Sequence, residues 1–336
     1  MMNTADRVEF TKEMRDYIIL APNMADIHFS LLINIFSQYG YRVELLKNDG
    51  RTVVDEGLKY VHNDTCYPAL LVIGQLIDAL NTGKYDPDKT ALMITQSGGG
   101  CRASNYIHLL RKALKKAGYP QVPVISLNLS RLEKNSGFKI RISMALKMLS
   151  AVIYGDLIML LKNQVEPYEK NEGECKRLVQ KWIDGISEMF RKGRGYSFGE
   201  MKKLLPEITK SFSEVPVKNI VKTKVGVVGE IYVKYSPLAN NHLEEFLFGQ
   251  GCEVMVPGLL GFFLFKVDNR LEDIKLYGGS KLKKIAMQFA IWYLTKIETT
   301  LLDAVRAYGR FTVPSTYAHI KEICKKFIGP GCNMGE

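Results

Sequence analysis

The sequence predicts an α/β protein with two Rossmann-like parallel-sheet domains, separated by a helical insertion, of which the second domain is incomplete. Strand-like and helical segments alternate through about the first 130 residues, the pattern then becomes helical, and strand-like segments return near residue 224. A chain of 336 residues is long enough for two such cores. We expect the boundaries to divide the chain into residues 1–135, 136–220 and 221–336.

The first domain is predicted from compact apolar runs that alternate with amphipathic ones. The expected strands are residues 17–21, 42–46, 91–95 and 122–127. The expected helices are residues 27–38, a second helix that runs to about residue 80, and residues 103–116. Asp64 or Thr65 can cap the second helix, Pro68 suits its first turn, and Gly118 ends the third. Strands that alternate with helices indicate a right-handed, doubly wound parallel sheet. Ligands of such sheets bind beyond the carboxyl ends of the strands.

The remainder of the chain is predicted to be helical first and mixed afterwards. Residues 138–212 contain no convincing strand. The expected elements after them are strands at 225–233 and 253–256 and helices at 243–249, 281–308 and 315–327. So few strands do not complete a second sheet, which suggests that its other strands belong to a segment absent from this sequence.

Charge and hydropathy restrict the function classes. The formal net charge is +11, and the basic excess is heaviest over residues 174–234. A phosphate-bearing ligand or an acidic partner would be favoured there, although a solvated helical face is the simpler interpretation. No nucleic-acid motif is present, so no nucleic-acid partner is expected. The longest apolar stretch, residues 144–161, is interrupted by Lys147 and Asp156, so we expect no membrane span.

The N-terminus and the cysteines indicate a reducing compartment. The first residues lack the apolar core and cleavage site of a signal peptide, so we expect a cytoplasmic protein. Six cysteines at irregular spacing do not describe a disulfide framework. Reduced thiols or metal ligands are therefore the default.

Cys66 and Cys101 occupy matching places, since each follows an extended or apolar run and begins an amphipathic helical stretch. A thiol at a helix N-terminus is exposed to the positive end of the helix dipole and to unpaired N–H groups, which favour thiolate. A single buried cysteine is more often a small core residue, but two in equivalent loops favour metal ligation. Cys175, Cys252 and Cys324 are predicted to be structural.

Three further features are weaker candidates. Ser97, Gly98, Gly99 and Gly100 could bind a cofactor, because a loop without side chains can cradle phosphate or approach a bulky cluster, although it matches neither the Rossmann fingerprint nor the P-loop. Glu230, in a β-rich run, is a weak catalytic candidate whose simpler role is a loop hydrogen bond. His28, after the first strand, is an equally weak one, and its simpler role is a satisfied histidine at a helix start.

At these residues the chain resembles the 2-hydroxyacyl-CoA (2-hydroxyglutaryl-CoA) dehydratase superfamily, in particular its activase-associated, double-cubane-cluster-like branch. The resembling stretches are residues 21–28, 63–68, 95–106 and 229–233, and the likeness extends over nearly the whole chain. The resemblance implies that Cys66 and Cys101 are ligands of an oxygen-sensitive [4Fe–4S] cluster between two Rossmann-like domains. The family's third ligand lies in a Phe-Gly-Cys-Leu-Pro-type segment near the C-terminus. This sequence lacks that segment, and the pattern around Cys332 does not match it.

The implied function is that of an iron–sulfur-dependent radical dehydratase component, a lyase of anaerobic metabolism that acts on a 2-hydroxyacyl-CoA thioester. An ATP-dependent iron–sulfur activator would deliver the electron, and a second dehydratase-like subunit or a homodimer would complete the assembly. Two alternatives stay open: a double-cubane-type reductase or electron relay for another small substrate, and a cluster-free structural module of an activase-related protein. The sequence does not identify the acyl group.

Overall fold

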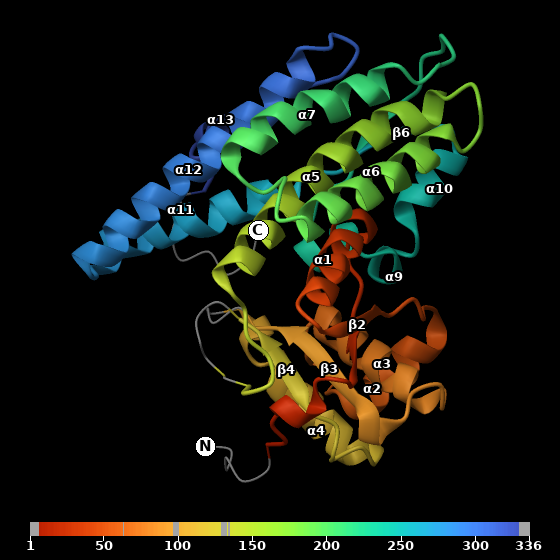
Figure 1. The fold of residues 1–336 in the computed structure, drawn as a ribbon, viewed down its shortest axis with the longest axis vertical. Coiled ribbons are helices and arrows are strands. Elements are labelled where there is room, and N and C mark those ends of the chain that lie inside the picture. Colours follow the sequence, from red (N-terminus) through yellow and green to blue (C-terminus); the bar gives the residue numbers. More distant parts are fainter. Residues whose placement is uncertain (1–6, 63, 97–100, 129–132, 134, 329–336) are drawn as a thin grey trace. The chain divides into compact units, whose positions relative to one another are not determined.

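The computed structural model describes residues 7–62, 64–96, 101–128, 133 and 135–328. The chain divides into two compact units (Figure 1). Unit 1 consists of residues 1–145 and 235–242, and unit 2 consists of residues 146–234 and 243–336. The expected boundaries at 135/136 and 220/221 therefore differ from this division, in which a short segment after residue 234 returns to unit 1.

Unit 1 is built on a four-stranded, fully parallel sheet in the order β2-β1-β3-β4. The strands are β1 (Ile18–Ala21), β2 (Arg42–Leu45), β3 (Thr90–Thr95) and β4 (Val124–Leu127). The helices are α1 (Asp26–Gln38), α2 (Arg51–Tyr60), α3 (Tyr67–Asn81), α4 (Tyr106–Ala117) and α9 (Pro237–Asn240). The sheet confirms the mixed α/β class and is compatible with a Rossmann-like fold.

The strand order creates a switch point between β1 and β3. In the register of the sheet, Ile18 of β1 lies opposite both Arg42 of β2 and Thr90 of β3. The chain leaves β1 toward β2 on one side and then returns to β3 on the other, so the loops after β1 and β3 diverge at the carboxyl edge. Open parallel sheets bind ligands at such switch points in the strand order.

The close approach of α2 and α3 depends on two glycines. A Cβ atom on Gly74 would lie 2.1 Å from the carbonyl oxygen of Val53, and one on Gly57 would lie 2.5 Å from that of Leu70. No side chain fits at either place, so the two backbones touch directly. Most of α3 is apolar and buried, which fixes the position of the residue at its start.

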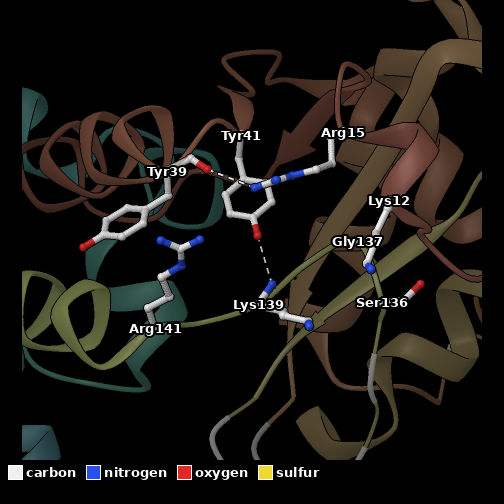
Figure 2. A pocket seen from close by; sticks show the side chains of 8 residues that line it. All are labelled: Lys12, Arg15, Tyr39, Tyr41, Ser136, Gly137, Lys139 and Arg141. Atoms are coloured by element: carbon white, nitrogen blue, oxygen red, sulfur yellow. Dashed lines mark hydrogen bonds between the residues drawn. The ribbon is translucent and has the colours of Figure 1, made fainter.

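The connection from β4 to the next helix is clamped onto the N-terminal segment. The Gly137 N–H donates to the Phe10 carbonyl at 2.9 Å, and a Cβ on Gly137 would lie 2.1 Å from the Thr11 oxygen. The N–H of Lys139 then donates to Tyr41 Oη at 3.0 Å (Figure 2). Segments about 100 or more residues apart in sequence are thereby held side by side.

Unit 2 is mainly helical. Its helices are α6 (Glu174–Arg191), α7 (Phe198–Ser213), α10 (Leu243–Gly249), α11 (Leu259–Tyr277), α12 (Lys281–Arg306) and α13 (Tyr317–Cys324), and most of α5 (Ile142–Val165) and α8 (Ile231–Tyr235) belongs to it. Two three-residue strands, β5 (Lys224–Gly226) and β6 (Glu253–Met255), form a parallel pair. The expected strand over 225–233 is wrong: it ends at Gly226, and helix α8 begins at Ile231.

Helix α5 is the one helix in the described residues that is long and apolar enough to cross a membrane. Most of its apolar window, 78%, is buried inside the protein, as it is in the core helix of a soluble fold. Its Asp156 carboxylate accepts the N–H groups of Leu259 and Leu260, both at 2.7 Å, and so caps the N-terminus of α11. The polar residue that interrupts the apolar stretch thus has a structural partner.

Candidate metal-binding site at two helix starts

Cys66 is the N-cap residue of α3. Its backbone is extended, with φ −60° and ψ 146°, and the helix begins at Tyr67. Pro68 lies in the first turn as predicted, but the cap is Cys66 and not Asp64 or Thr65, so the predicted cap is wrong by one or two residues. The N–H groups of Ala69 and Leu70 donate to the Cys66 carbonyl, at 3.0 and 3.3 Å. Proline has no N–H, so the start of α3 offers the sulfur fewer backbone donors than a helix without proline in its first turn. The side chain is half-buried.

Cys101 has nearly the same backbone conformation, φ −65° and ψ 142°, and is the N-cap residue of η4, a 3₁₀ turn over Arg102–Ser104. The regular helix α4 begins only at Tyr106. The expectation that a helix starts directly after each cysteine is therefore confirmed for Cys66, whereas Cys101 is followed first by this short turn. A single 3₁₀ turn has a much weaker dipole than a helix of several turns.

The two cysteine loops contact each other through two hydrogen bonds. Arg102, next to Cys101, donates from Nη1 to the Asp64 carbonyl at 2.8 Å. The Cys66 sulfur lies 2.6 Å from the hydroxyl oxygen of Tyr106, the first residue of α4. Tyr106 is 8% exposed, so this hydrogen bond is largely shielded from water. The loop after β3 and the loop before α3 therefore meet.

Topology explains why they meet. Helix α3 leads to the amino end of β3 and so runs against the strand direction, which puts its N-terminus at the carboxyl edge of the sheet. The loop with Cys101 leaves β3 at that same edge. Because α3 also packs against α4, the beginnings of both helical segments are neighbours.

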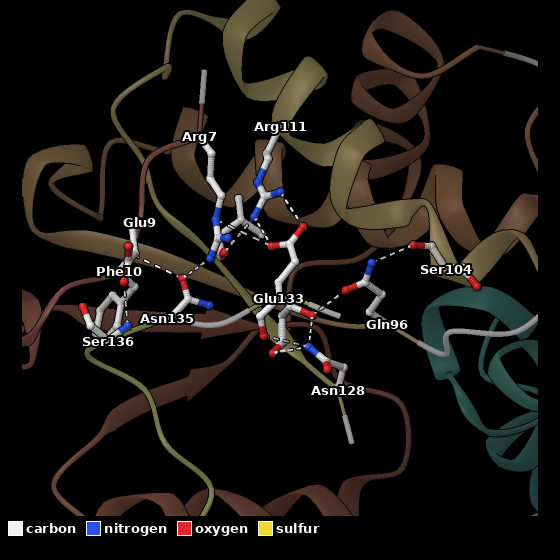
Figure 3. A network of polar contacts seen from close by, with 12 residues as sticks. Arg7, Glu9, Phe10, Gln96, Ser104, Arg111, Asn128, Glu133, Asn135 and Ser136 are labelled. Atoms are coloured by element: carbon white, nitrogen blue, oxygen red, sulfur yellow. Dashed lines mark hydrogen bonds and ion pairs between the residues drawn. The ribbon is translucent and has the colours of Figure 1, made fainter. Parts of the chain in front are cut away.

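Gln96 joins the two ends of the glycine-rich loop. It is 8% exposed, its Nε2 donates to the Ser104 carbonyl at 3.0 Å, and its Oε1 accepts the Ser126 hydroxyl at 2.7 Å (Figure 3). The predicted cofactor-binding residues Ser97, Gly98, Gly99 and Gly100 lie between Gln96 and Cys101 but outside the described residues. The hydrogen bonds of Gln96 tie β3, β4 and the Cys101 turn together.

Sequence reasoning gave no role to Gln96, Arg102 or Tyr106. A polar residue directly after an apolar strand was the available signal for Gln96. Nothing local distinguishes Tyr106 from any aromatic residue in the first turn of a helix, because its partner lies 40 residues away in the chain.

Of the two weaker catalytic candidates, His28 is buried and Glu230 makes a local hydrogen bond. His28, in the first turn of α1, is 1% exposed. Glu230 is exposed, and its carboxylate accepts the Val233 N–H at 3.0 Å at the start of α8. That bond is the one expected of a helix-starting carboxylate, and it matches the simpler role considered for Glu230.

The other described cysteines differ from Cys66 and Cys101. Cys175 is fully buried in α6, and burial, assisted by the carboxylates of Glu166 and Glu169, raises the pKa of its thiol to about 12. Such a thiol is not a thiolate near neutral pH. Cys252 is half-buried next to β6, and Cys324 is exposed at the end of α13.

The donor set is incomplete within the part of the chain that the structure describes. An iron–sulfur cubane takes three or four protein ligands. No group of three or more His, Cys, Asp or Glu side chains that could hold a metal ion occurs among the described residues. Cys66 and Cys101 thus supply at most two ligands there, and His28 does not complete a set with them.

Comparisons with protein-family models, with curated proteins and with solved structures found no match.

Proposed function

We propose that this chain is a cytoplasmic iron–sulfur protein of the 2-hydroxyacyl-CoA dehydratase type. It acts on a 2-hydroxyacyl-CoA thioester, receives electrons from an ATP-dependent activator and associates with a second dehydratase-like subunit or a second copy. In this proposal β5 and β6 are the beginning of a second Rossmann-like domain. The supporting observation is that Cys66 and Cys101, in loops far apart in sequence, are tied together by Arg102 and Tyr106.

Each residue of this cluster of side chains has a defined task in the proposal. The Cys66 and Cys101 sulfurs hold two positions of a [4Fe–4S] cluster, which supplies one-electron transfer when bound. With Cys66 as a thiolate, the Tyr106 hydroxyl would donate to its sulfur, a contact of the kind that orients a ligand and tunes its basicity. Arg102 keeps the two loops in register through the Asp64 carbonyl. The remaining ligands come from the partner subunit.

Iron retention tests the ligand assignment. The chain is reconstituted anaerobically, and iron and sulfide per chain are measured after gel filtration. We expect Cys66→Ser and Cys101→Ser to lose most of the bound iron, because a serine hydroxyl is hardly deprotonated near neutral pH and binds iron poorly. Cys324→Ser is the matched control, since that thiol is exposed on α13 and should not affect iron content.

Thermal melts of the apo variants separate ligation from packing. Cys66 and Cys101 are only half-buried, so their serine variants should lose less than the roughly 2 kcal/mol of a core truncation. Iron retained by both serine variants would contradict the ligand assignment. A wild-type chain that takes up no iron even with its partner present would favour the cluster-free structural module.

Tyr106→Phe sharpens the test, because it removes only the hydroxyl that contacts Cys66. We expect iron to be released about tenfold more readily, as for the loss of other groups that orient metal ligands. The control is Tyr119→Phe, whose hydroxyl donates to the exposed Asn81 side chain. With iron bound, turnover of a 2-hydroxyacyl-CoA with an activator separates a dehydratase from an electron relay.

A further inference from the structure

Four cationic side chains surround one hollow of about 240 Å³ in unit 1 (Figure 2). They are Lys12, Arg15, Lys139 and Arg141, and Tyr39, Tyr41, Ser136 and Gly137 complete the lining. No carboxylate lines this hollow, and within the described residues none of the four cations forms a salt bridge. Like charges gathered at one hollow repel one another, and an anion bound between them relieves that repulsion.

Both arginines are oriented by the two tyrosines. Arg15 lies over the Tyr41 ring, 5.2 Å from its centroid, and donates from Nη2 to the Tyr39 carbonyl at 3.2 Å. Arg141 lies over the Tyr39 ring, 6.0 Å from the centroid. Stacking of this kind restricts a guanidinium without consuming most of its N–H donors. The donors that remain suit the oxygens of a phosphate group.

The two lysines are brought together by the backbone clamp at Gly137. Gly137 packs against the backbone of Thr11 so closely that a Cβ on Gly137 would touch the Thr11 carbonyl oxygen. Lys12 is the residue after Thr11, and Lys139 is two residues after Gly137. The N–H of Lys139 is held by Tyr41 Oη at 3.0 Å. These fixed backbones place two point charges beside the two oriented guanidiniums.

A second, larger hollow of about 810 Å³ shares Lys12, Ser136, Lys139 and Arg141 with the first. Its further lining is mixed, with the apolar Phe138 and Ile142 and the carboxylates of Glu9 and Glu133 among it. Carboxylates disfavour a second anionic group there but accept hydroxyl and amine donors. The two hollows together fit a phosphate group joined to an uncharged organic body.

We propose that this hollow binds the diphosphate or phosphate group of a phosphate ester, at the amino ends of β1 and β2. It lies at the opposite edge of the sheet from the cysteine loops and does not depend on an iron–sulfur cluster. The sequence placed the basic excess in residues 174–234, whereas this site is assembled from residues 12–15 and 139–141. The ligand would therefore be additional to whatever reacts at the cysteines.

Titration calorimetry with pyrophosphate at about 0.15 M salt tests the site. We expect saturable binding to the wild-type chain and about tenfold weaker binding to the double variant Lys12→Gln/Lys139→Gln, which loses two charge-assisted contacts. The matched control is Lys112→Gln/Lys116→Gln on α4, which removes the same charge from an exposed face of the same unit and should change affinity less than about twofold. Circular dichroism verifies that all variants are folded.

ADP is titrated as a second probe to distinguish an ester from free diphosphate. Tighter binding of ADP than of pyrophosphate would support an organic body in the larger hollow. Binding of pyrophosphate with exclusion of ADP would overturn the ester. Absence of saturation, or an equal loss in both double variants, would overturn the site itself, because diffuse attraction to a basic surface predicts both.

Discussion

Two helix contacts, one in each unit, are built on opposite principles. In unit 1, α2 and α3 touch backbone to backbone at Gly57 and Gly74, without room for a side chain. In unit 2, the carboxylate of Asp156 on α5 accepts two N–H groups at the start of α11. The first contact depends on shape alone, and the second depends on a buried hydrogen-bonded charge. The difference indicates that α3, which carries Cys66 at its start, is positioned by steric fit.

The largest effect is expected from Gly74→Ala. The new Cβ would lie 2.1 Å from the Val53 oxygen, and because that oxygen belongs to the backbone, the helices must separate. Overpacking of this kind should lower the free energy of unfolding by about 3 kcal/mol. Urea unfolding followed by circular dichroism measures it.

Gly185→Ala in α6 is the control, since nothing lies within 4 Å of its Cβ position. It should stabilise the protein by about 0.5–1 kcal/mol, because alanine loses less backbone entropy in a helix. If the two variants behave alike, steric fit between α2 and α3 is not what holds this part of unit 1.

Asp156→Ala should have the next largest effect, about 2 kcal/mol, because it leaves two buried N–H groups without their acceptor. Asp156→Asn keeps one acceptor oxygen and should lose less. Tryptophan fluorescence reports unit 2 selectively, since Trp182 and Trp292 lie in α6 and α12. The control is Asp303→Asn, because the Asp303 carboxylate is mostly exposed. If Asp156→Ala lowers the free energy of unfolding no more than Asp303→Asn does, the contrast between the two helix contacts is wrong.

The smallest effect is expected from the ion pair of Arg111 and Glu133 in unit 1. Burial alone would raise the pKa of Glu133. Two hydrogen bonds from Arg111, at 2.8 and 2.7 Å, and the positive charges of Arg111 and Arg7 have the opposite effect (Figure 3). Together they outweigh burial, so the pKa of Glu133 lies below its usual value near 4.5. The stabilisation is therefore present above about pH 4.5 and is lost as the pH falls through the folded-state pKa.

Arg111→Met should accordingly lower the free energy of unfolding by about 1 kcal/mol or less at neutral pH. The difference in unfolding free energy between variant and wild type should become smaller below pH 4.5. Urea unfolding of both proteins at neutral and acidic pH measures this gap. A gap that stays constant or widens on acidification would show that Glu133 is not held as a carboxylate by Arg111.

Much of unit 1 could be predicted because its signals are local. The alternation of strands and helices through β4 follows from hydrophobic period, and Pro68 marks the first turn of α3, although Cys66 caps that helix and not Asp64 or Thr65. The expected strand over 225–233 failed because its valines favour β-structure while Glu230 supplies the acceptor that starts α8. Helix α2 was not predicted from the sequence. Its position depends on the backbone contact with α3 at Gly57 and Gly74.

The sequence by itself determined the α/β class, the placement of Cys66 near the start of a helix and the irregular cysteine spacing, since periodicity, caps and cysteine spacing act over a few residues. Only the tertiary structure decided that Tyr106 reaches the Cys66 sulfur, that Asp156 caps α11, and that Lys12 and Lys139 share one hollow. Each of these pairs joins segments at least 40 residues apart. Such contacts depend on how whole strands and helices pack, because the residues around one partner contain no information about the position of the other.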